Sequence, residues 1–262
     1  MEAKGRLLKW LLWVPAFSLV LFVPLPLYAD SSKLVVEPDL VRIGVFFDGA
    51  RVNLLAEIPE GCDAVIEVTG KTIKNEVMQK VRHWDLWMNE GEIEIIDAPC
   101  LYLAMSNEPA PLSNPGADVP WGYEALKKRV SFTGEISGAR AEKIFREFFH
   151  LKENRGLYGM FPGALKVSHT SGNRSIVRGS FRLSSRVTPG TYRVSLSVSQ
   201  KGRILSRKSV SLKVIMVGFP ALVYRLANDH PFIYGFLAIA IAVVAGLVAG
   251  LVFGKLRKIS PR

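Results

Sequence analysis

The sequence is poor in the residues and motifs that carry catalytic or metal chemistry. Its 262 residues include only two cysteines and four histidines. It contains no C-x-x-C, H-E-x-x-H or G-x-S-x-G motif and no glycine-rich phosphate loop. These absences argue against the classes of enzyme that such motifs mark. We therefore expect a non-enzymatic protein without a cofactor.

Acidic residues are missing from a long part of the chain. Between Asn154 and Asn228 there is no Asp or Glu against 13 Lys and Arg, whereas residues 30–115 carry 15 acidic and 7 basic residues. The basic stretch precedes an apolar C-terminal segment, which favours a membrane-proximal face that binds anionic lipid or an acidic partner. A solvated strand face is the alternative. The face would be formed by Arg178, Arg182, Arg193, Arg207 and Lys208.

Both ends of the chain carry membrane signals. Residues 1–29 have a basic start, an apolar run and a small residue, Ala29, as secretory signal peptides do; an uncleaved anchor is the alternative. Residues 231–253 are uncharged and long enough to span a bilayer, and the basic tail 254–262 should remain in the cytoplasm. We expect an inner-membrane, single-pass protein with a periplasmic ectodomain. An exported domain does not meet nucleic acid, so we exclude it as a partner despite the net charge of +11.

The predicted span and the segment before it suggest two further features. Residues 218–230 have an amphipathic helical pattern that suits a helix lying on the membrane surface. Small residues recur every fourth position in the span, which predicts a face that packs closely against another helix, either of a second copy or of a polytopic protein. They are Ala238, Ala242, Gly246, Gly250 and Gly254.

The ectodomain reads as mainly β, with short alternating strands separated by turns. We expect two immunoglobulin-like β-sandwich units, an acidic one at residues 30–115 and a basic, membrane-proximal one at 158–217. Residues 116–157 contain two helical patterns and would form a helical spacer between them. The stretch "TPGTYRVSLSV" is typical of immunoglobulin-like sandwiches, but it indicates a fold and not a function.

Three groups of residues are candidates for binding or bridging. In "RHWDLWMNEG", read as one strand, Trp84 faces the core while Trp87, His83 and Asn89 form a candidate contact surface. Cys62 and Cys100 would form a disulfide in an oxidising compartment, with two buried free thiols as the alternative. A copper site is also conceivable from thioether and imidazole ligands, although core packing explains Met88 and Met105 better. Its ligands would be Met78, His83, Met88 and Met105.

Several motifs, in their order, resemble the Alph_Pro_TM family of alphaproteobacterial transmembrane proteins. They are "LVVEPDLVRIGVFFDGARVNLLAEI", "WDLWMN", "YLAMSN", "GLY", "VTPGTYRVSLSV" and "VGF…HPFIYGFLAIAIAVVAG". The resemblance implies a signal peptide, an exported domain, one C-terminal span and no established activity. It also implies a polytopic partner, because the family is associated with genes for TauE/SafE-type sulfite or sulfonate permeases.

These observations support two hypotheses about function. The first is a non-enzymatic envelope protein, an accessory or adaptor subunit whose span packs against a membrane partner. The second is a periplasmic module that binds a ligand or copper through the acidic β unit.

Overall fold

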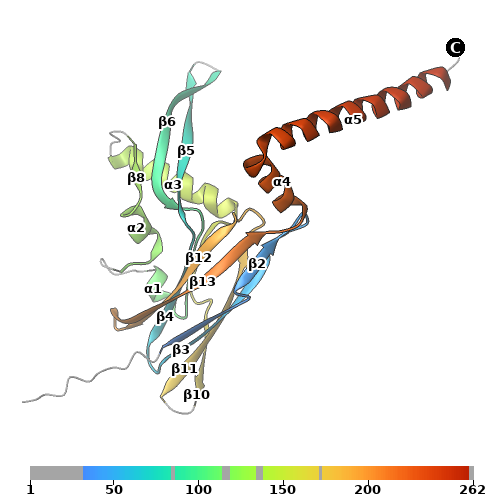
Figure 1. Ribbon diagram of the computed structural model, residues 1–262. Coiled ribbons are helices and arrows are strands. Elements are labelled where there is room, and N and C mark those ends of the chain that lie inside the picture. Colours follow the sequence, from blue (N-terminus) through green and yellow to red (C-terminus); the bar gives the residue numbers. More distant parts are fainter. Residues whose placement is uncertain (1–31, 84–85, 114–118, 134–137, 171–172, 260–262) are drawn as a thin grey trace, which may run out of the picture. The chain divides into compact units, whose positions relative to one another are not determined.

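The computed structural model describes residues 32–83, 86–113, 119–133, 138–170 and 173–259, without the side chains of residues 74–93, 113, 169–170 and 252–259 (Figure 1). The described residues are mainly β, as predicted, and form three sheets. In order, sheet A contains β1 (Lys33–Glu37), β3 (Ala50–Pro59), β11 (Arg174–Leu183) and β10 (Lys166–Thr170). Sheet B contains β2 (Leu40–Ile43), β13 (Arg203–Met216), β12 (Gly190–Gln200), β4 (Asp63–Thr69), β7 (Tyr102–Ser106) and β9 (Tyr158–Phe161). Sheet C contains β5 (Thr72–His83), β6 (Leu86–Pro99) and β8 (Ser131–Phe132).

The strands of the two halves of the chain are interleaved, so the prediction of two separate sandwich units is wrong. In sheet A, β3 pairs with β11 along its whole length, from Ala50 opposite Leu183 to Pro59 opposite Arg174. In sheet B, β4 pairs with β12. Alternating apolar residues show which side chains face a core, but they do not show which strands are neighbours. Strands far apart in sequence therefore looked like members of two units.

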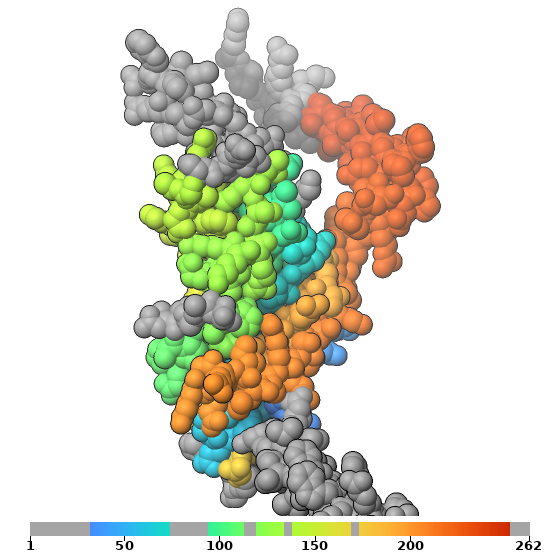
Figure 2. Space-filling view, turned by 90° about the vertical axis from the view of Figure 1, so that its left-hand side faces the viewer, coloured from blue at the N-terminus to red at the C-terminus, as the bar shows by residue number. Residues whose placement is uncertain are grey.

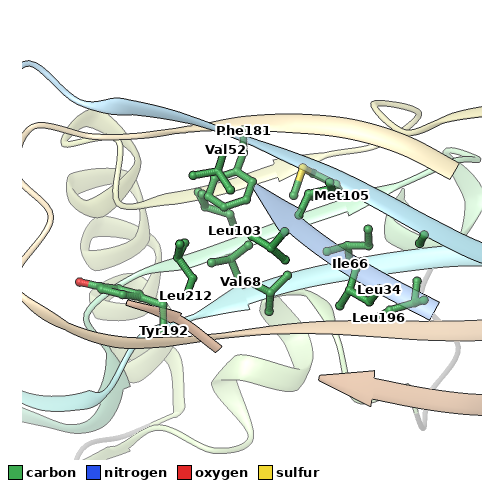
Figure 3. Close-up of a cluster of buried hydrophobic side chains, with 14 of the residues drawn as sticks. Leu34, Val52, Ile66, Val68, Leu103, Met105, Phe181, Tyr192, Leu196 and Leu212 are labelled. Atoms are coloured by element: carbon green, nitrogen blue, oxygen red, sulfur yellow. The ribbon is translucent and has the colours of Figure 1, made fainter. Parts of the chain in front are cut away.

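One hydrophobic core joins sheets A and B. The alternating residues of β3 that we expected on one face, Val52, Leu54, Ala56 and Ile58, are all buried in it. On sheet B, the expected apolar face of β12 contributes Tyr192, Val194, Leu196 and Val198. Figure 3 shows side chains from both sheets meeting in this core. The period-two pattern thus predicted the buried faces correctly.

Helices cover the other face of sheet B rather than link two domains. They are α1 (Ala110–Ser113), α2 (Gly122–Lys127) and α3 (Gly138–Asn154). The expected apolar residues Ile144, Phe145 and Phe148 of α3 are buried in a second core with Tyr102 and Tyr158 of sheet B. Figure 2 shows this helical layer, coloured from green to yellow-green, on the face turned toward the viewer. The prediction of a helical spacer is therefore wrong in its role, although both helices exist.

The position of the helical layer explains why β4 and β7 are buried on both faces. Every residue of β7 is buried, as are residues 64–68 of β4. One side of each strand packs into the core with sheet A, and the other lies beneath the helices. In α3, Leu151 belongs to the predicted apolar stripe but is exposed, and Lys152 is buried instead, with its ammonium 5.2 Å from the ring centroid of Phe148.

Two helices complete the chain. Helix α4 (Phe219–Asp229) occupies the segment predicted to be amphipathic, and α5 (Pro231–Ile259) contains the predicted span. No residue of α4 is buried.

Candidate functional site

The stretch "RHWDLWMNEG" is not one strand. Strand β5 ends at His83, β6 begins at Leu86, and the two residues pair with each other. Arg82 pairs with Trp87 in the same way. The chain therefore reverses direction within the stretch, and alternation counted straight through it is wrong. The proposed contact surface of Trp87, His83 and Asn89 concerns side chains outside those that the structure describes, so it stays a prediction.

The copper site stays a prediction, because only one of its four proposed ligands has a described side chain. The side chains of Met78, His83 and Met88 lie outside the described set, whereas Met105 is buried in the core between sheets A and B. Packing therefore explains Met105, as expected. In the described ranges, no group of three or more His, Cys, Asp or Glu side chains is arranged to hold a metal ion.

The predicted disulfide between Cys62 and Cys100 is wrong, because the two residues lie at opposite ends of the β4–β7 pair. Cys62 directly precedes β4, while the amide of Cys100 donates to the carbonyl of Lys71, beyond the other end of that strand. Nine residues of extended chain separate Cys62 from Lys71, about 25–30 Å. A disulfide requires Cα atoms within about 7 Å of each other. Both cysteines are buried free thiols.

Reductant will therefore leave the stability of the protein unchanged, within about 0.5 kcal/mol. The check is chemical denaturation with and without dithiothreitol, together with a thiol titration of the unfolded, unreduced protein. Two reactive thiols per chain are expected. A titre near zero, restored by reduction, would contradict the structure.

The five basic residues do not form one face. Arg178 and Arg182 are exposed on β11 of sheet A, whereas Arg193 lies on β12 of sheet B. Arg207 and Lys208 are consecutive in β13, so their side chains point to opposite faces. The predicted pair Arg178 and Arg182 does share a face, but the set as a whole is divided between two sheets.

Arg207 has a specific partner that sequence reasoning missed. Its Nη2 lies 3.0 Å from Oε2 of Glu67, which is on β4, one strand beyond β12. The Glu67 side chain is 3% exposed and that of Arg207 is 46% exposed. In the register, Ser197 is opposite Arg207 and Ser195 is opposite Glu67. These small residues of β12 leave room for the arginine to reach across the strand.

Glu67 also ties the helical layer to sheet B through Tyr102. The Tyr102 hydroxyl donates to Oε1 of Glu67 at 2.8 Å and accepts from the amide of Gly122, at the start of α2, at 2.6 Å. Burial raises the pKa of the Glu67 carboxyl, while the Tyr102 hydrogen bond and the charges of Arg207 and Arg129 lower it in part. Burial, with the nearby Glu67, raises the pKa of Tyr102. We call Glu67, Tyr102 and Arg207 the polar centre.

One signal for the polar centre was present in the sequence. Glu67 interrupts the apolar run "AVIEV", and a charged residue in a strand buried on both faces needs a partner. The identity of the partners required the fold. The polar centre places an acid, a phenol and a guanidinium in contact, and their hydrogen bonds join β4 and β7 to α2 and to β13 of the same sheet.

The C-terminal helix has the surface of a membrane anchor. Pro231–Leu251 is long and apolar enough to cross a bilayer, and none of this segment is buried by the described residues. Ala238, Ala242, Gly246 and Gly250 lie in it, and Gly254 follows in the same helix. A Cβ added at Gly246 or Gly250 would meet no described atom within 4 Å. In the preceding helix α4, Phe219, Leu222 and Tyr224 are exposed.

The comparisons with known proteins agree with this anchor. A family model described as "Putative transmembrane protein (Alph_Pro_TM)" matches residues 33–255, which include all three sheets and most of α5. No curated protein matches the chain.

Proposed function

Because the chain belongs to the Alph_Pro_TM family of transmembrane proteins, we propose that it is a non-enzymatic accessory subunit of the inner membrane, anchored by α5. Lys255, Arg257 and Lys258 follow the span and favour a cytoplasmic C-terminus. The β-rich part then lies in the periplasm, where the signal-like residues 1–29 would direct it.

The observation that carries the proposal is the small-residue row on α5, formed by Ala238, Ala242, Gly246, Gly250 and Gly254. Residues four apart lie on one helix face, and side chains this small allow a second backbone to approach closely. A polytopic protein, such as a TauE/SafE-type permease, is the proposed partner, since it offers several helices and the chain supplies only one candidate span among its described residues.

Replacing Gly246 and Gly250 together by Leu will abolish the association with the membrane partner. Two branched side chains hold the facing helix away, so we expect at least a tenfold loss of cross-linked product. The measurement is cross-linking in native membranes, followed by purification of the tagged protein in mild detergent and identification of the product by mass spectrometry.

The matched control is Ala245→Leu with Ala249→Leu. These positions are also small and four apart, but each lies about 100° around the helix from the glycine that follows it, Gly246 or Gly250. Membrane levels of each variant are compared first. Equal association of both double variants, at equal levels, would show that the row is not the interface. A product of twice the chain mass would identify a second copy instead of a permease.

A further inference from the structure

The outer face of sheet A carries a row of four side chains, one from each strand. Val35 is opposite Leu55, Leu55 is opposite Arg178, and Arg178 is opposite Lys166. Directly paired residues of antiparallel strands point to the same face. The row therefore crosses the whole sheet from β1 to β10, the four-stranded layer in Figure 1, with two apolar residues at one end and two cations at the other.

The apolar half of this row is open to solvent. Val35 is 37% exposed and Leu55 is 40% exposed, whereas their neighbours Val36 and Leu54 are buried on the core side. The four residues line a groove of about 500 Å³. Its lining also includes the small residues Ala164, Gly179 and Ser180, and Asn53. A groove of this size, with an apolar floor and a few polar groups at its ends, has the composition of a small-ligand site.

The cations of the row are directly opposed, which is unfavourable in the protein alone. Like charges at opposite positions of neighbouring strands repel each other. Three arginines share the outer face of β11. Arg174 pairs with Glu57 at 3.4 Å and Arg182 pairs with Asp48 at 3.0 Å. Among the described residues, Arg178, the middle one, has no carboxylate partner, and it is the one that lines the groove.

Glu37 makes the two ends of the groove differ in charge. It lines the groove from β1, the edge strand opposite Lys166 on β10, and it is paired in register with Asn53. The electrostatic potential therefore changes from positive at Arg178 and Lys166 to negative at Glu37. An anion is favoured at the first end and disfavoured at the second.

We propose that this groove binds a small amphiphile with one anionic group and a short apolar chain. The anionic group contacts Arg178 and Lys166, because an arginine forms two parallel hydrogen bonds with a carboxylate. The chain lies over Leu55 and Val35, and Glu37 excludes a second anionic group at the far end. The site lies in the β-rich part of the protein and is independent of the membrane partner proposed above.

The test uses the full-length protein in lipid nanodiscs, with hexanoate as the probe and empty nanodiscs as the reference for partitioning. Isothermal titration will show saturable binding of hexanoate. Acetate, which lacks the chain, will bind at least tenfold more weakly. Adipate, which has a second carboxylate in place of the terminal methyl group of hexanoate, will also bind at least tenfold more weakly. Glu37→Gln will recover most of the adipate binding.

Two arginine variants locate the anionic group. Arg178→Gln will weaken hexanoate binding about tenfold, since a charge-assisted hydrogen bond of this kind is lost. Arg182→Gln removes the same charge from the same strand face, but outside the groove, and will leave the binding within about twofold. Circular dichroism checks that both variants fold. Absence of saturable hexanoate binding, or equal weakening by both substitutions, would overturn the proposal.

Discussion

Replacing Tyr102 by Phe will lower the free energy of unfolding by about 3 kcal/mol, because one hydroxyl serves two buried groups. It donates to Glu67 and accepts from the amide of Gly122. Phe retains the ring, so packing in the second core is preserved. The change leaves a buried carboxylate oxygen and a buried amide without their partner. Chemical denaturation of the detergent-solubilised protein, followed by tryptophan fluorescence, measures the effect.

Tyr158→Phe is the control for this substitution. Tyr158 lies in the same aromatic cluster, with its ring centroid 6.2 Å from that of Tyr102. Its hydroxyl donates only to the neutral carbonyl of Pro99 among the described contacts. Its loss should therefore lower the free energy of unfolding by about 1 kcal/mol. If both variants lose the same amount, the contact with Glu67 contributes nothing beyond an ordinary hydrogen bond.

Replacing Arg207 by Met will lower the free energy of unfolding by about 2 kcal/mol at pH 7.5. Removing one member of a buried ion pair leaves the other charge uncompensated. This loss is smaller than that expected for a fully buried ion pair, because solvent already screens Arg207, whose side chain is 46% exposed. Arg193→Met replaces an arginine of the neighbouring strand β12 that is itself exposed; it is the control and should change stability by less than about 0.5 kcal/mol.

The deficit of Arg207→Met will shrink as the pH falls from 7.5 toward the raised folded-state pKa of Glu67. The folded-state pKa of Glu67 is raised, so between the unfolded and folded pKa values the folded protein binds more protons, and stability falls as pH rises. The arginine charge lowers this pKa. Without it, the folded-state pKa of Glu67 rises further, so the pH range over which stability falls extends to higher pH. Denaturation of both proteins across this range gives the difference. A deficit that is constant with pH would assign the loss to packing of the arginine side chain.

Local features of the fold could be predicted from the sequence, whereas its connectivity could not. The alternation in β3 and β12 identified buried residues correctly, and the pattern of α3 identified most of its buried face. The pairing of β3 with β11 joins residues more than a hundred positions apart. Alternation contains no information about such pairing, because any half-buried strand satisfies it.

The same limit explains the errors at the candidate sites. The Cys62–Cys100 disulfide was inferred from the oxidising compartment and the even number of cysteines. The distance between the two cysteines is decided by the register of β4 and β7. The basic face was inferred from composition, but the strands that carry it belong to two sheets. The polar centre and the groove on sheet A each combine residues from both halves of the chain, so neither could be assembled before strand order was known.

The interleaving of the strands determines when, during synthesis, the sheets can form. Strands β3 and β4 gain their neighbours β11 and β12 only after residues 174–200 have been synthesised. Strand β13, which completes the pairing of β12, ends at Met216, directly before α4, and α5 follows α4. In the proposed topology, the N-terminal strands reach the periplasm first. Until the later strands arrive, the backbone hydrogen-bonding groups along their edges have no partner strand. The sheets close as the anchor enters the translocation channel, so a chain truncated before β11 would leave edges that favour aggregation.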